Sequence, residues 1–119
     1  MPIIESVGNT HPTSMVIEWL EFTMNPEARD RFVQLDREIW NPFLQTKPGF
    51  LRKQIWLDRN DTHRVIIMVE WSDRKLWKNI TPTEIATITQ QFDTQFATPY
   101  QLIVSREFQP ISSAEIPNT

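Results

Sequence analysis

The stretch Trp40–Trp71, WNPFLQTKPGFLRKQIWLDRNDTHRVIIMVEW, decides the fold of this chain. It begins as the end of an amphipathic helix and breaks at Lys47-Pro48-Gly49, where glycine can take a positive φ. Two strands are expected next, at residues 50–57 and 64–71, and the polar segment 58–62 joins them as a hairpin. A helix followed by a β-hairpin in this order is half of a βαββαβ domain.

Two of the expected strands are apolar on both faces. Residues 65–69 are VIIMV, an uninterrupted apolar run, and residues 15–22 are MVIEWLEF, with large apolar side chains at odd and even positions. A strand that is buried on both sides lies in the middle of its sheet. We therefore expect 15–22 and 64–71 to be the central strands, with 50–57 beside them.

The first main helix is expected to begin at Asn25-Pro26, where Asn can cap free N–H groups and Pro suits the first turn. Its apolar residues recur three or four positions apart as far as Phe43, which predicts one buried face. Pro42 lies within this pattern and should either kink the helix near residues 38–40 or end it, with a short second piece to about Thr46. The face expected to be polar carries Arg29, Asp30, Gln34, Asp36 and Arg37.

The second main helix is expected over residues 82–96, because Thr81-Pro82-Thr83-Glu84 has the form of a capping box with Pro in the first turn. A shorter helix capped by Ser72 is expected just before it. The last strand, residues 100–108, is expected to be an edge strand because one of its sides is wetter than the other. Simple alternation places these residues on its apolar side: Tyr100, Leu102, Val104, Arg106 and Phe108.

The order βαββαβ predicts an α+β, ferredoxin-like domain with a four-stranded antiparallel sheet. Each helix has one apolar stripe, so both should lie on the same face of the sheet. The other face then needs cover, and a second copy of the chain related by two-fold symmetry would supply it. The sequence thus predicts a homodimeric α/β barrel, with the domain at 14–109, a flexible arm at 1–13 and a flexible tail at 110–119.

Composition excludes several classes of function. The 119 residues carry a net charge of −3 without a basic block, which disfavours binding to nucleic acid. Cysteine is absent, so there are no disulfides, thiolate nucleophiles or Cys-based metal sites. The only glycines are Gly8 and Gly49, too few for a phosphate-binding glycine-rich loop. No secretory signal or membrane-length apolar run is present, and a cytoplasmic protein that makes no membrane contact is expected.

Short motifs spread over residues 14–109 carry a family resemblance. They are Ile17-Glu18-Trp19-Leu20-Glu21-Phe22, Glu38-Ile39-Trp40-Asn41-Pro42, Pro48-Gly49-Phe50, Gln54-Ile55-Trp56-Leu57, Val69-Glu70-Trp71-Ser72, Trp77 and Ser105-Arg106-Glu107-Phe108. This set resembles a small family of uncharacterised cyanobacterial proteins, which is itself similar to the antibiotic biosynthesis monooxygenase (ABM) type of dimeric α/β barrel. The helix–PGF–strand join and the apolar strand ending in Glu-Trp-Ser are specific for the fold rather than for a reaction.

The resemblance implies a range of activities. Proteins of this type include cofactor-free oxygenases of aromatic polyketides and quinols, haem-degrading enzymes and proteins with no assigned activity. The haem-degrading members typically use an axial histidine on a helix. Neither main helix of this chain contains a histidine, so haem chemistry is not expected, and no cofactor is predicted.

Glu18 and Glu70 are the candidate catalytic residues. Each lies within a strand expected to be central, where a carboxylate is costly to bury unless it is paired or protonated. They could face a cavity with raised pKa and act as general bases towards a phenolic or enolic substrate. Alternatively, they form ion pairs with Arg52, Arg64 or Arg106, or lie exposed at a strand end or dimer rim.

Trp56, Arg52 and Gln54 are the candidate ligand-pocket residues, because their strand face mixes aromatic and polar side chains as a pocket wall does. The alternative is that the aromatic residues only fill the core or a dimer interface. His63 is expected in the hairpin and His11 in the N-terminal arm, where both are solvated. With so few histidines and no calcium-loop spacing, no metal site is predicted.

Two functions remain open from the sequence. The first is an ABM-like enzyme or binder of a small apolar, aromatic or quinone-type ligand, and if an enzyme, a cofactor-free monooxygenase. The second is a non-catalytic structural, stress-linked or regulatory homodimer. A cavity of several hundred Å³ that contains a buried carboxylate would favour the first function.

Overall fold

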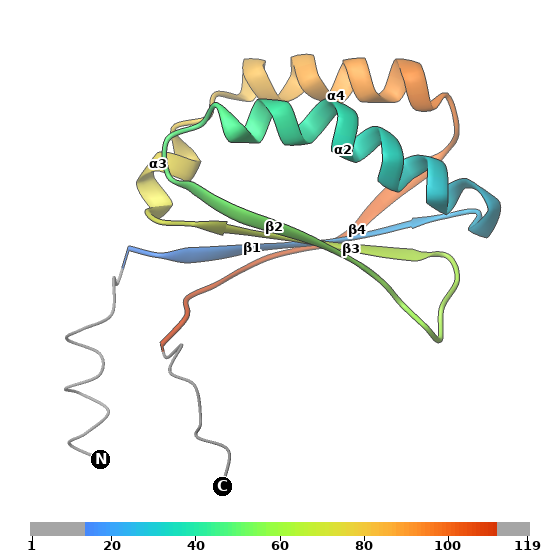
Figure 1. The fold of residues 1–119 in the computed structure, drawn as a ribbon, viewed down its shortest axis with the longest axis horizontal. Helices are drawn as coiled ribbons and strands as arrows, with labels where there is room; N and C mark the ends of the chain where they lie inside the picture. The colour runs from blue at the N-terminus through green and yellow to red at the C-terminus, as the bar shows by residue number, and fades with distance from the viewer. Residues whose placement is uncertain (1–13, 112–119) are drawn as a thin grey trace, which may run out of the picture.

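A computed structural model describes residues 14–111, so the predicted arm at 1–13 and most of the predicted tail lie outside the described residues. Two main helices lie side by side over one face of a twisted sheet (Figure 1). The elements in chain order are β1 (Val16–Met24), η1 (Pro26–Ala28), α2 (Arg29–Gln45), β2 (Phe50–Leu57), β3 (Arg64–Trp71), α3 (Arg74–Lys78), α4 (Pro82–Phe96) and β4 (Tyr100–Phe108).

The four strands form one antiparallel sheet in the order β2-β3-β1-β4. The two strands that are apolar on both faces, β1 and β3, are the central pair, as the sequence predicts. The α+β, ferredoxin-like arrangement with both main helices on one face is confirmed.

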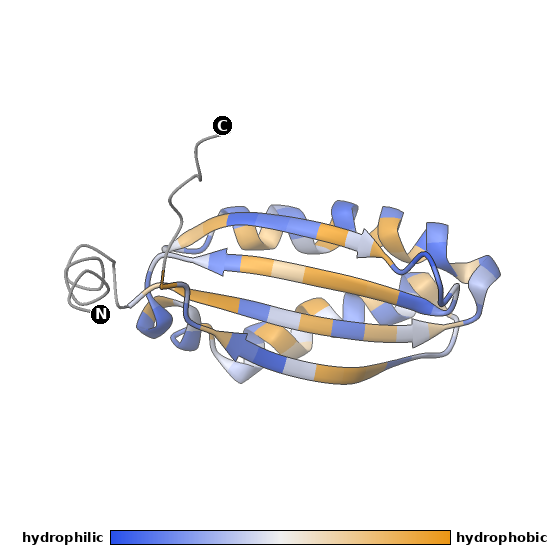
Figure 2. Ribbon diagram, turned by 90° about the horizontal axis from the view of Figure 1, so that it is seen from below, coloured by the Kyte–Doolittle hydropathy of each residue, from blue (hydrophilic) through white to orange (hydrophobic). Residues whose placement is uncertain are grey.

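The register divides the side chains of the sheet between two faces. Glu18 of β1 and Lys53 of β2 both pair with Val69 of β3, so the three residues form one row across three strands. Because side chains opposite each other in a sheet point to the same face, this whole row faces the helices. Figure 2 shows the sheet from the other side, which the helices leave uncovered. We call these the helix face and the open face.

Two irregularities shift which residues reach each face. In β2 the register slips between Phe50 and Arg52, so Phe50 turns to the helix face and its ring lies 5.8 Å from that of Trp71. Between β1 and β4 it slips at the step from Val104 to Leu102. The predicted simple alternation in β4 is therefore wrong, because an extra residue in one strand of a pair turns the rest of that strand over. The face assignments on either side of this slip are Tyr100 and Leu102 towards the helices, and Val104, Arg106 and Phe108 on the open face.

The first helical segment differs in detail from the prediction. Asn25 makes no side-chain capping hydrogen bond, and the segment begins with the short 3₁₀ turn η1. The continuous α2 then runs through Pro42 to Gln45, so the prediction that Pro42 could end the helix is wrong. Pro42 lies in the last turn, so the one hydrogen bond that it cannot donate, to the carbonyl of Glu38, is lost near the end of the helix rather than in its middle. Asp36, expected on the polar face, is buried with 4% of its surface exposed.

The second helical segment follows its sequence signals more closely. The backbone N–H of Glu84 donates to Thr81 Oγ1 (3.1 Å) and that of Thr81 donates to Glu84 Oε2 (2.9 Å), which confirms the capping box. The short α3 is capped by Asp73 rather than by Ser72, because the Asp73 carboxylate accepts the N–H of Lys75 at 2.8 Å. Ala97, in a left-handed conformation with φ 52°, ends α4.

The turn between α2 and β2 depends on glycine. Gly49 has φ +89°, and a Cβ built there would lie 2.9 Å from Leu76 Cδ1. Both the left-handed backbone and the contact with α3 exclude a side chain at this position. The predicted helix–PGF–strand join thus also fixes α3 against the end of the sheet.

The core lies between the sheet and the helices. Its fully buried large side chains are Trp71, Phe92, Phe96 and Val65. Aromatic rings meet edge to face within it, as for Phe32 and Phe92 at 5.1 Å, a geometry that adds to the hydrophobic term. Within residues 14–111, no helix is long and apolar enough to cross a membrane.

Candidate functional site

A cavity of about 440 Å³ lies between the sheet and the helices. Its volume falls within the range of roughly 300–1,000 Å³ that is usual for small-molecule sites. Every strand and both main helices contribute to its wall. Most of the wall is apolar and aromatic, and its aromatic side chains include Phe22, Phe32, Trp40, Trp71, Trp77 and Phe92.

Glu18 brings a carboxyl group into this apolar wall from the central strand β1. The indole Nε1–H of Trp71, a residue with 0% exposure, donates to Glu18 Oε1 at 3.2 Å. Burial raises the pKa of Glu18, and this effect exceeds the lowering by the Trp71 hydrogen bond and by the charges of Lys78 and Lys53. A carboxyl group with a raised pKa can take up and release a proton nearer to neutral pH, as a general base must.

A second polar group lies in the same cavity wall, between β2 and α2. The side chains of Lys53 and Asp36 are only 6% and 5% exposed and form an ion pair. Lys53 Nζ also donates to Asn41 Oδ1 at 2.8 Å. Burial lowers the pKa of Lys53 and raises that of Asp36, while their mutual attraction opposes both shifts. Burying such a pair is costly, which makes its position beside a cavity a candidate functional feature.

Glu70 lies on the open face, in a shallower groove of about 390 Å³. There it forms an ion pair with Arg52, whose side chain is 62% exposed. The same groove is lined by Trp56, which is 41% exposed, and by Trp19, whose ring packs edge to face against it at 5.3 Å. This groove is therefore separated from the Glu18 cavity by the sheet itself.

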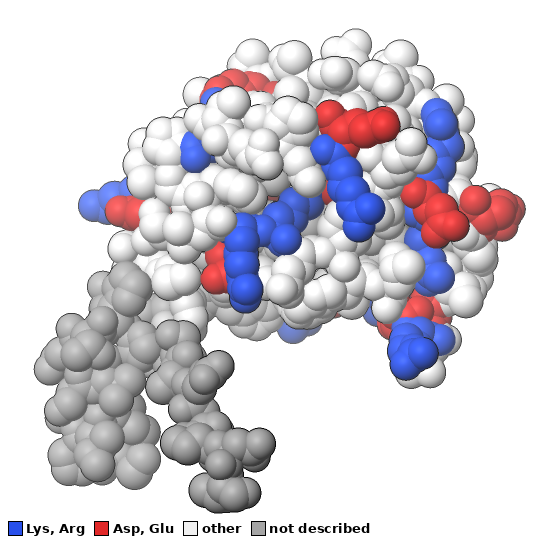
Figure 3. All heavy atoms as spheres, in the orientation of Figure 1, with Lys and Arg blue, Asp and Glu red and all other residues white. Residues whose placement is uncertain are grey.

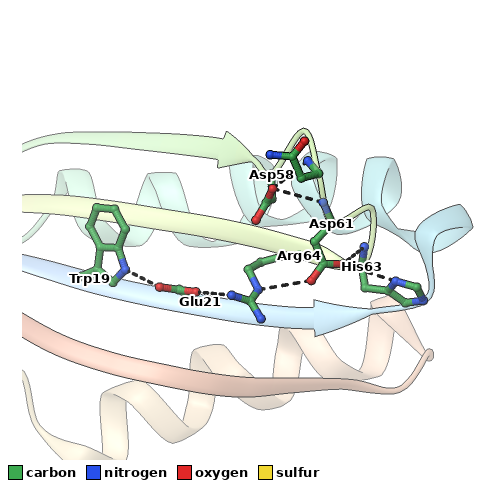
Figure 4. A network of polar contacts seen from close by, with 7 residues as sticks. Trp19, Glu21, Asp58, Asp61, His63 and Arg64 are labelled. Carbon is green, nitrogen blue, oxygen red and sulfur yellow. Dashed lines mark hydrogen bonds and ion pairs between the residues drawn. The ribbon is translucent and has the colours of Figure 1, made fainter.

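A polar network on the open face leads from this groove to the hairpin (Figure 4). Trp19 Nε1–H donates to Glu21 Oε2 at 2.9 Å, and Arg64 donates to Glu21 Oε1 at 3.0 Å. Arg64 also lies 3.7 Å from Asp61, which is in turn 3.5 Å from His63. His63 is exposed in the hairpin, where the sequence places it.

The structure separates the residues that the sequence proposed as one site. Glu18 and Glu70 lie on opposite faces of the sheet, and each meets a different environment. Arg52 and Trp56 accompany Glu70, and Gln54, which pairs with Met68 of that face, lies between them. Their proposed catalytic and ligand-binding roles stay predictions.

Sequence reasoning missed Asp36 and Lys53. Asp36 stands among charged residues of α2, and Lys53 stands between Arg52 and Gln54, so both resemble solvated side chains. The sequence does hold a signal that Asp36 lies on the buried face of the helix. Asp36 follows Leu35 directly and precedes Ile39 by three positions, so it falls within the apolar periodicity of the helix. In β2, Lys53 shares its strand face with Ile55, which packs against the core.

Charge on the visible surface is mixed. Basic and acidic side chains are interspersed over the face drawn in Figure 3, and neither sign forms a continuous patch. Within residues 14–111, no group of three or more His, Asp or Glu side chains is arranged to hold a metal ion.

The family comparison covers the domain from β1 to the start of α4. The family model described as antibiotic biosynthesis monooxygenase matches residues 15–85, which is more than half of the chain. The chain belongs to this family. The match includes Glu18, Asp36, Lys53 and Glu70, and it ends within α4. A comparison with curated proteins gave no match for this member of the family.

Solved structures share the fold of this antibiotic biosynthesis monooxygenase family member. SnoaB, a cofactor-independent oxygenase from Streptomyces nogalater, is 17% identical, with a TM-score of 0.56 over 88% of this chain and 99% of SnoaB. A monooxygenase from the gene ActVA-Orf6 of Streptomyces coelicolor, solved with the ligand nanaomycin D, is 13% identical, with a TM-score of 0.64 over 91% of this chain and 96% of that protein. At these identities the likeness establishes the fold alone.

Proposed function

We propose that this protein is a cofactor-free monooxygenase of a phenolic or enolic aromatic substrate, which binds in the cavity between sheet and helices. The observation that carries the proposal is the carboxyl group of Glu18, held by Trp71 in an otherwise mainly apolar, aromatic cavity of about 440 Å³. Membership of the antibiotic biosynthesis monooxygenase family supports the reaction class. SnoaB, which shares the fold, is described as a cofactor-independent oxygenase, and this supports a reaction without a cofactor.

The aromatic wall would bind the substrate and exclude water. Phe22, Phe32 and Phe92 line the cavity, where a planar aromatic ligand would gain both burial and ring contacts. Exclusion of water strengthens the electrostatic interaction of any charge formed inside. This environment favours a delocalised anion over a small, localised one.

Glu18 would act as the general base. Its carboxylate takes the proton of the substrate hydroxyl or of the activated carbon, and the electron pair of that bond delocalises into the ring system. The electron-rich anion then reduces O₂, the co-reactant. One oxygen atom forms a new bond to the substrate carbon, which becomes a quinone-type carbonyl. The substrate loses two hydrogens overall, from this carbon and, in a phenol, from the hydroxyl, and they leave with the other oxygen as water.

The test is oxygen consumption with a panel of quinols and anthrone-type substrates, measured for the wild type and for Glu18→Gln. The amide keeps the shape of the side chain and an acceptor for Trp71, but it cannot take up the proton. We expect the variant to bind the substrates and to lose about 10²–10⁴-fold in turnover, the usual contribution of a general base. The wild-type rate should rise with pH through the raised pKa of Glu18. Binding without oxygen uptake in the wild type would instead favour a ligand-binding module.

The open face supports the proposed homodimer. It exposes Trp56 and Phe108 on a sheet surface that no element of residues 14–111 covers. Exposed aromatic surface of this kind marks association sites, and sheets pack well face to face. Sedimentation at micromolar concentration should give a dimer, and Trp56→Glu should give a monomer. A monomeric wild type would contradict the proposed barrel.

Two further parts of the proposal concern the setting of the protein. We place it in the cytoplasm, and we relate it to uncharacterised cyanobacterial proteins on the short motifs quoted above. These parts are supported by sequence alone. Fractionation of the producing cells, with detection of the full-length chain, tests the first part.

A further inference from the structure

A single row of the sheet connects the two polar groups of the cavity. Glu18 on β1, Val69 on β3 and Lys53 on β2 are direct neighbours in the register, and all three line the cavity. Two strand spacings separate the backbones of Glu18 and Lys53, which is about 9–10 Å. The apolar side chain of Val69 lies between them. A flat ligand of two or three fused rings could lie on Val69 and reach both polar ends.

Lys53 is held so that its charge is available to such a ligand. Its Nζ donates to Asp36 and to Asn41, and an ammonium group has three donors. Within residues 14–111, these are the two acceptors that Lys53 meets, so one N–H is left for a ligand. Because its side chain is only 6% exposed, this N–H acts in a medium where water competes little.

The charge balance of the cavity changes when Glu18 takes a proton from a ligand. Before the transfer, the negative charge lies on Glu18. After the transfer, it lies on the ligand, and a conjugated ligand spreads it to whichever oxygen can carry it. The charges around Lys53 are those of Asp36, Glu18 and Arg37, and Lys78 acts on Glu18 from α3. A cation at the far end of the row stabilises the ligand anion more strongly than the neutral ligand.

We propose that Lys53 is a substrate-binding residue that selects aromatic ligands with a carbonyl oxygen conjugated to, and remote from, the hydroxyl that faces Glu18. Glu18 takes the proton at one end, and Lys53 donates a hydrogen bond to the carbonyl oxygen at the other, where the negative charge arrives. Asp36 and Asn41 are positioning residues that hold the Lys53 ammonium group at the cavity wall. This assignment rests on the proposed function for the role of Glu18, and it adds the class of substrate.

The test uses binding rather than turnover. The probe is a naphthol with an acetyl group at the opposite end of the ring system, because its ionised form absorbs at longer wavelength than its neutral form. Naphthol without the ketone and acetylnaphthalene without the hydroxyl are the matched single-group probes. Titration of the bound probe from acid to alkaline pH, under nitrogen, gives its ionisation midpoint. We expect the wild type to bind the two-group probe at least about tenfold more tightly than either single-group probe.

Lys53→Met removes the cation but keeps the unbranched apolar stem of the side chain. The ionisation midpoint of the bound two-group probe should rise by about one pH unit or more in this variant, a tenfold loss of preference for the anion. Lys75→Met, on the exposed surface of α3, is the control and should leave the midpoint unchanged. If Lys53→Met folds poorly, the double variant Asp36→Asn with Lys53→Met takes its place, because it removes both charges of the buried pair. It should also raise the ionisation midpoint of the bound probe.

The outcomes separate this assignment from the proposed function. An unchanged midpoint in both Lys53 variants, or equal affinity for the two-group and single-group probes, would overturn the role of Lys53. A shifted midpoint supports it even if the wild type consumes no oxygen with any substrate. In that case the cavity is a binding site for hydroxyaryl ketones, and the monooxygenase proposal alone is wrong.

Discussion

The two faces of the sheet place two glutamate side chains in opposite environments. Glu18 and Glu70 lie on adjacent central strands, one register position apart, because Ile17 pairs with Glu70 and Glu18 pairs with Val69. Glu18 faces the helices, where aromatic side chains surround it and burial raises its pKa. Glu70 faces outward and forms an ion pair with the exposed Arg52. A shift of one position in the register thus separates a candidate base from a surface carboxylate.

The largest expected effect compares the two carboxylates directly. Glu18→Gln should lower turnover by about 10²–10⁴-fold, whereas Glu70→Gln should leave it within about threefold of the wild type. The reason is that only Glu18 lines the aromatic cavity in which the substrate is proposed to bind. Steady-state kinetics of both variants with the same substrate measure the difference. Equal losses in the two variants would show that both faces take part in the reaction.

The second comparison concerns packing on the two faces. Phe92→Ala on the helix face should lower the free energy of unfolding by about 3–5 kcal/mol, because Phe92 is 2% exposed and leaves a cavity. Trp56→Ala on the open face should cost the isolated protomer less than about 1 kcal/mol, since this side chain is 41% exposed. Urea unfolding at several protein concentrations gives both values. A large, concentration-dependent loss for Trp56→Ala would mean that its face is buried in the dimer.

The third comparison is the pH dependence of stability. The folded state holds the Glu18 proton more tightly than the unfolded state, whose pKa is near the ordinary 4.5. Stability should therefore fall as the pH rises from about 4.5 through the raised pKa, by about 1.4 kcal/mol for each unit of the shift. Glu18→Gln should lack this loss and be more stable than the wild type at pH 8.

Urea unfolding of the wild type and Glu18→Gln at pH 4 and pH 8 measures this difference. The contributions of Asp36 and Lys53 cancel in the comparison except for the attraction between Lys53 and Glu18, which is smaller than the desolvation of Glu18. Glu70→Gln is the matched control, and it should be slightly less stable than the wild type at pH 8 because it loses the ion pair with Arg52. If Glu18→Gln were less stable than the wild type at pH 8, the carboxylate would be favourably paired rather than desolvated.

The smallest expected effect belongs to the polar network of the open face. Glu21→Gln should cost about 0.2–1 kcal/mol, because Trp19 and Arg64 are partly exposed and keep an amide oxygen as acceptor. The cost should shrink as salt screens the Arg64 charge. Thermal unfolding in low and high salt measures it. A cost that salt does not change would show that the network is shielded from solvent, as in a dimer interface.

The sequence predicts the elements of this fold better than it predicts their faces. Three strands, at residues 50–57, 64–71 and 100–108, have the predicted bounds, because turn residues and apolar runs mark them clearly. The faces depend on alternation, which fails wherever a strand holds an extra residue. Simple alternation would place Phe50 on the same face as Arg52 and Trp56, but the irregularity after Phe50 turns its ring to the other face, where it packs on Trp71.

The candidate site could be predicted only in part for a related reason. Glu18 was identifiable because a carboxylate inside a doubly apolar strand is unusual. Asp36 and Lys53 were not, since each is an ordinary charged residue until the register and the helix packing bring them together. Sequence separation conceals the pair, because Asp36 lies on α2 and Lys53 on β2, and the two meet only where the helix packs over that strand.

The extra residue in β2 has a consequence for insertions and deletions. Leu51 is 49% exposed and lies between Phe50, which pairs with Trp71, and Arg52, which pairs with Glu70. Deleting one residue from a regular strand turns every following side chain to the wrong face. Deleting Leu51 would instead make Phe50 and Arg52 neighbours in the chain, as their partners Trp71 and Glu70 already are. Lys53 would keep its place opposite Val69. We therefore expect β2 to tolerate the deletion of this one residue, because the pairing register of the strand and the face of each remaining side chain stay the same.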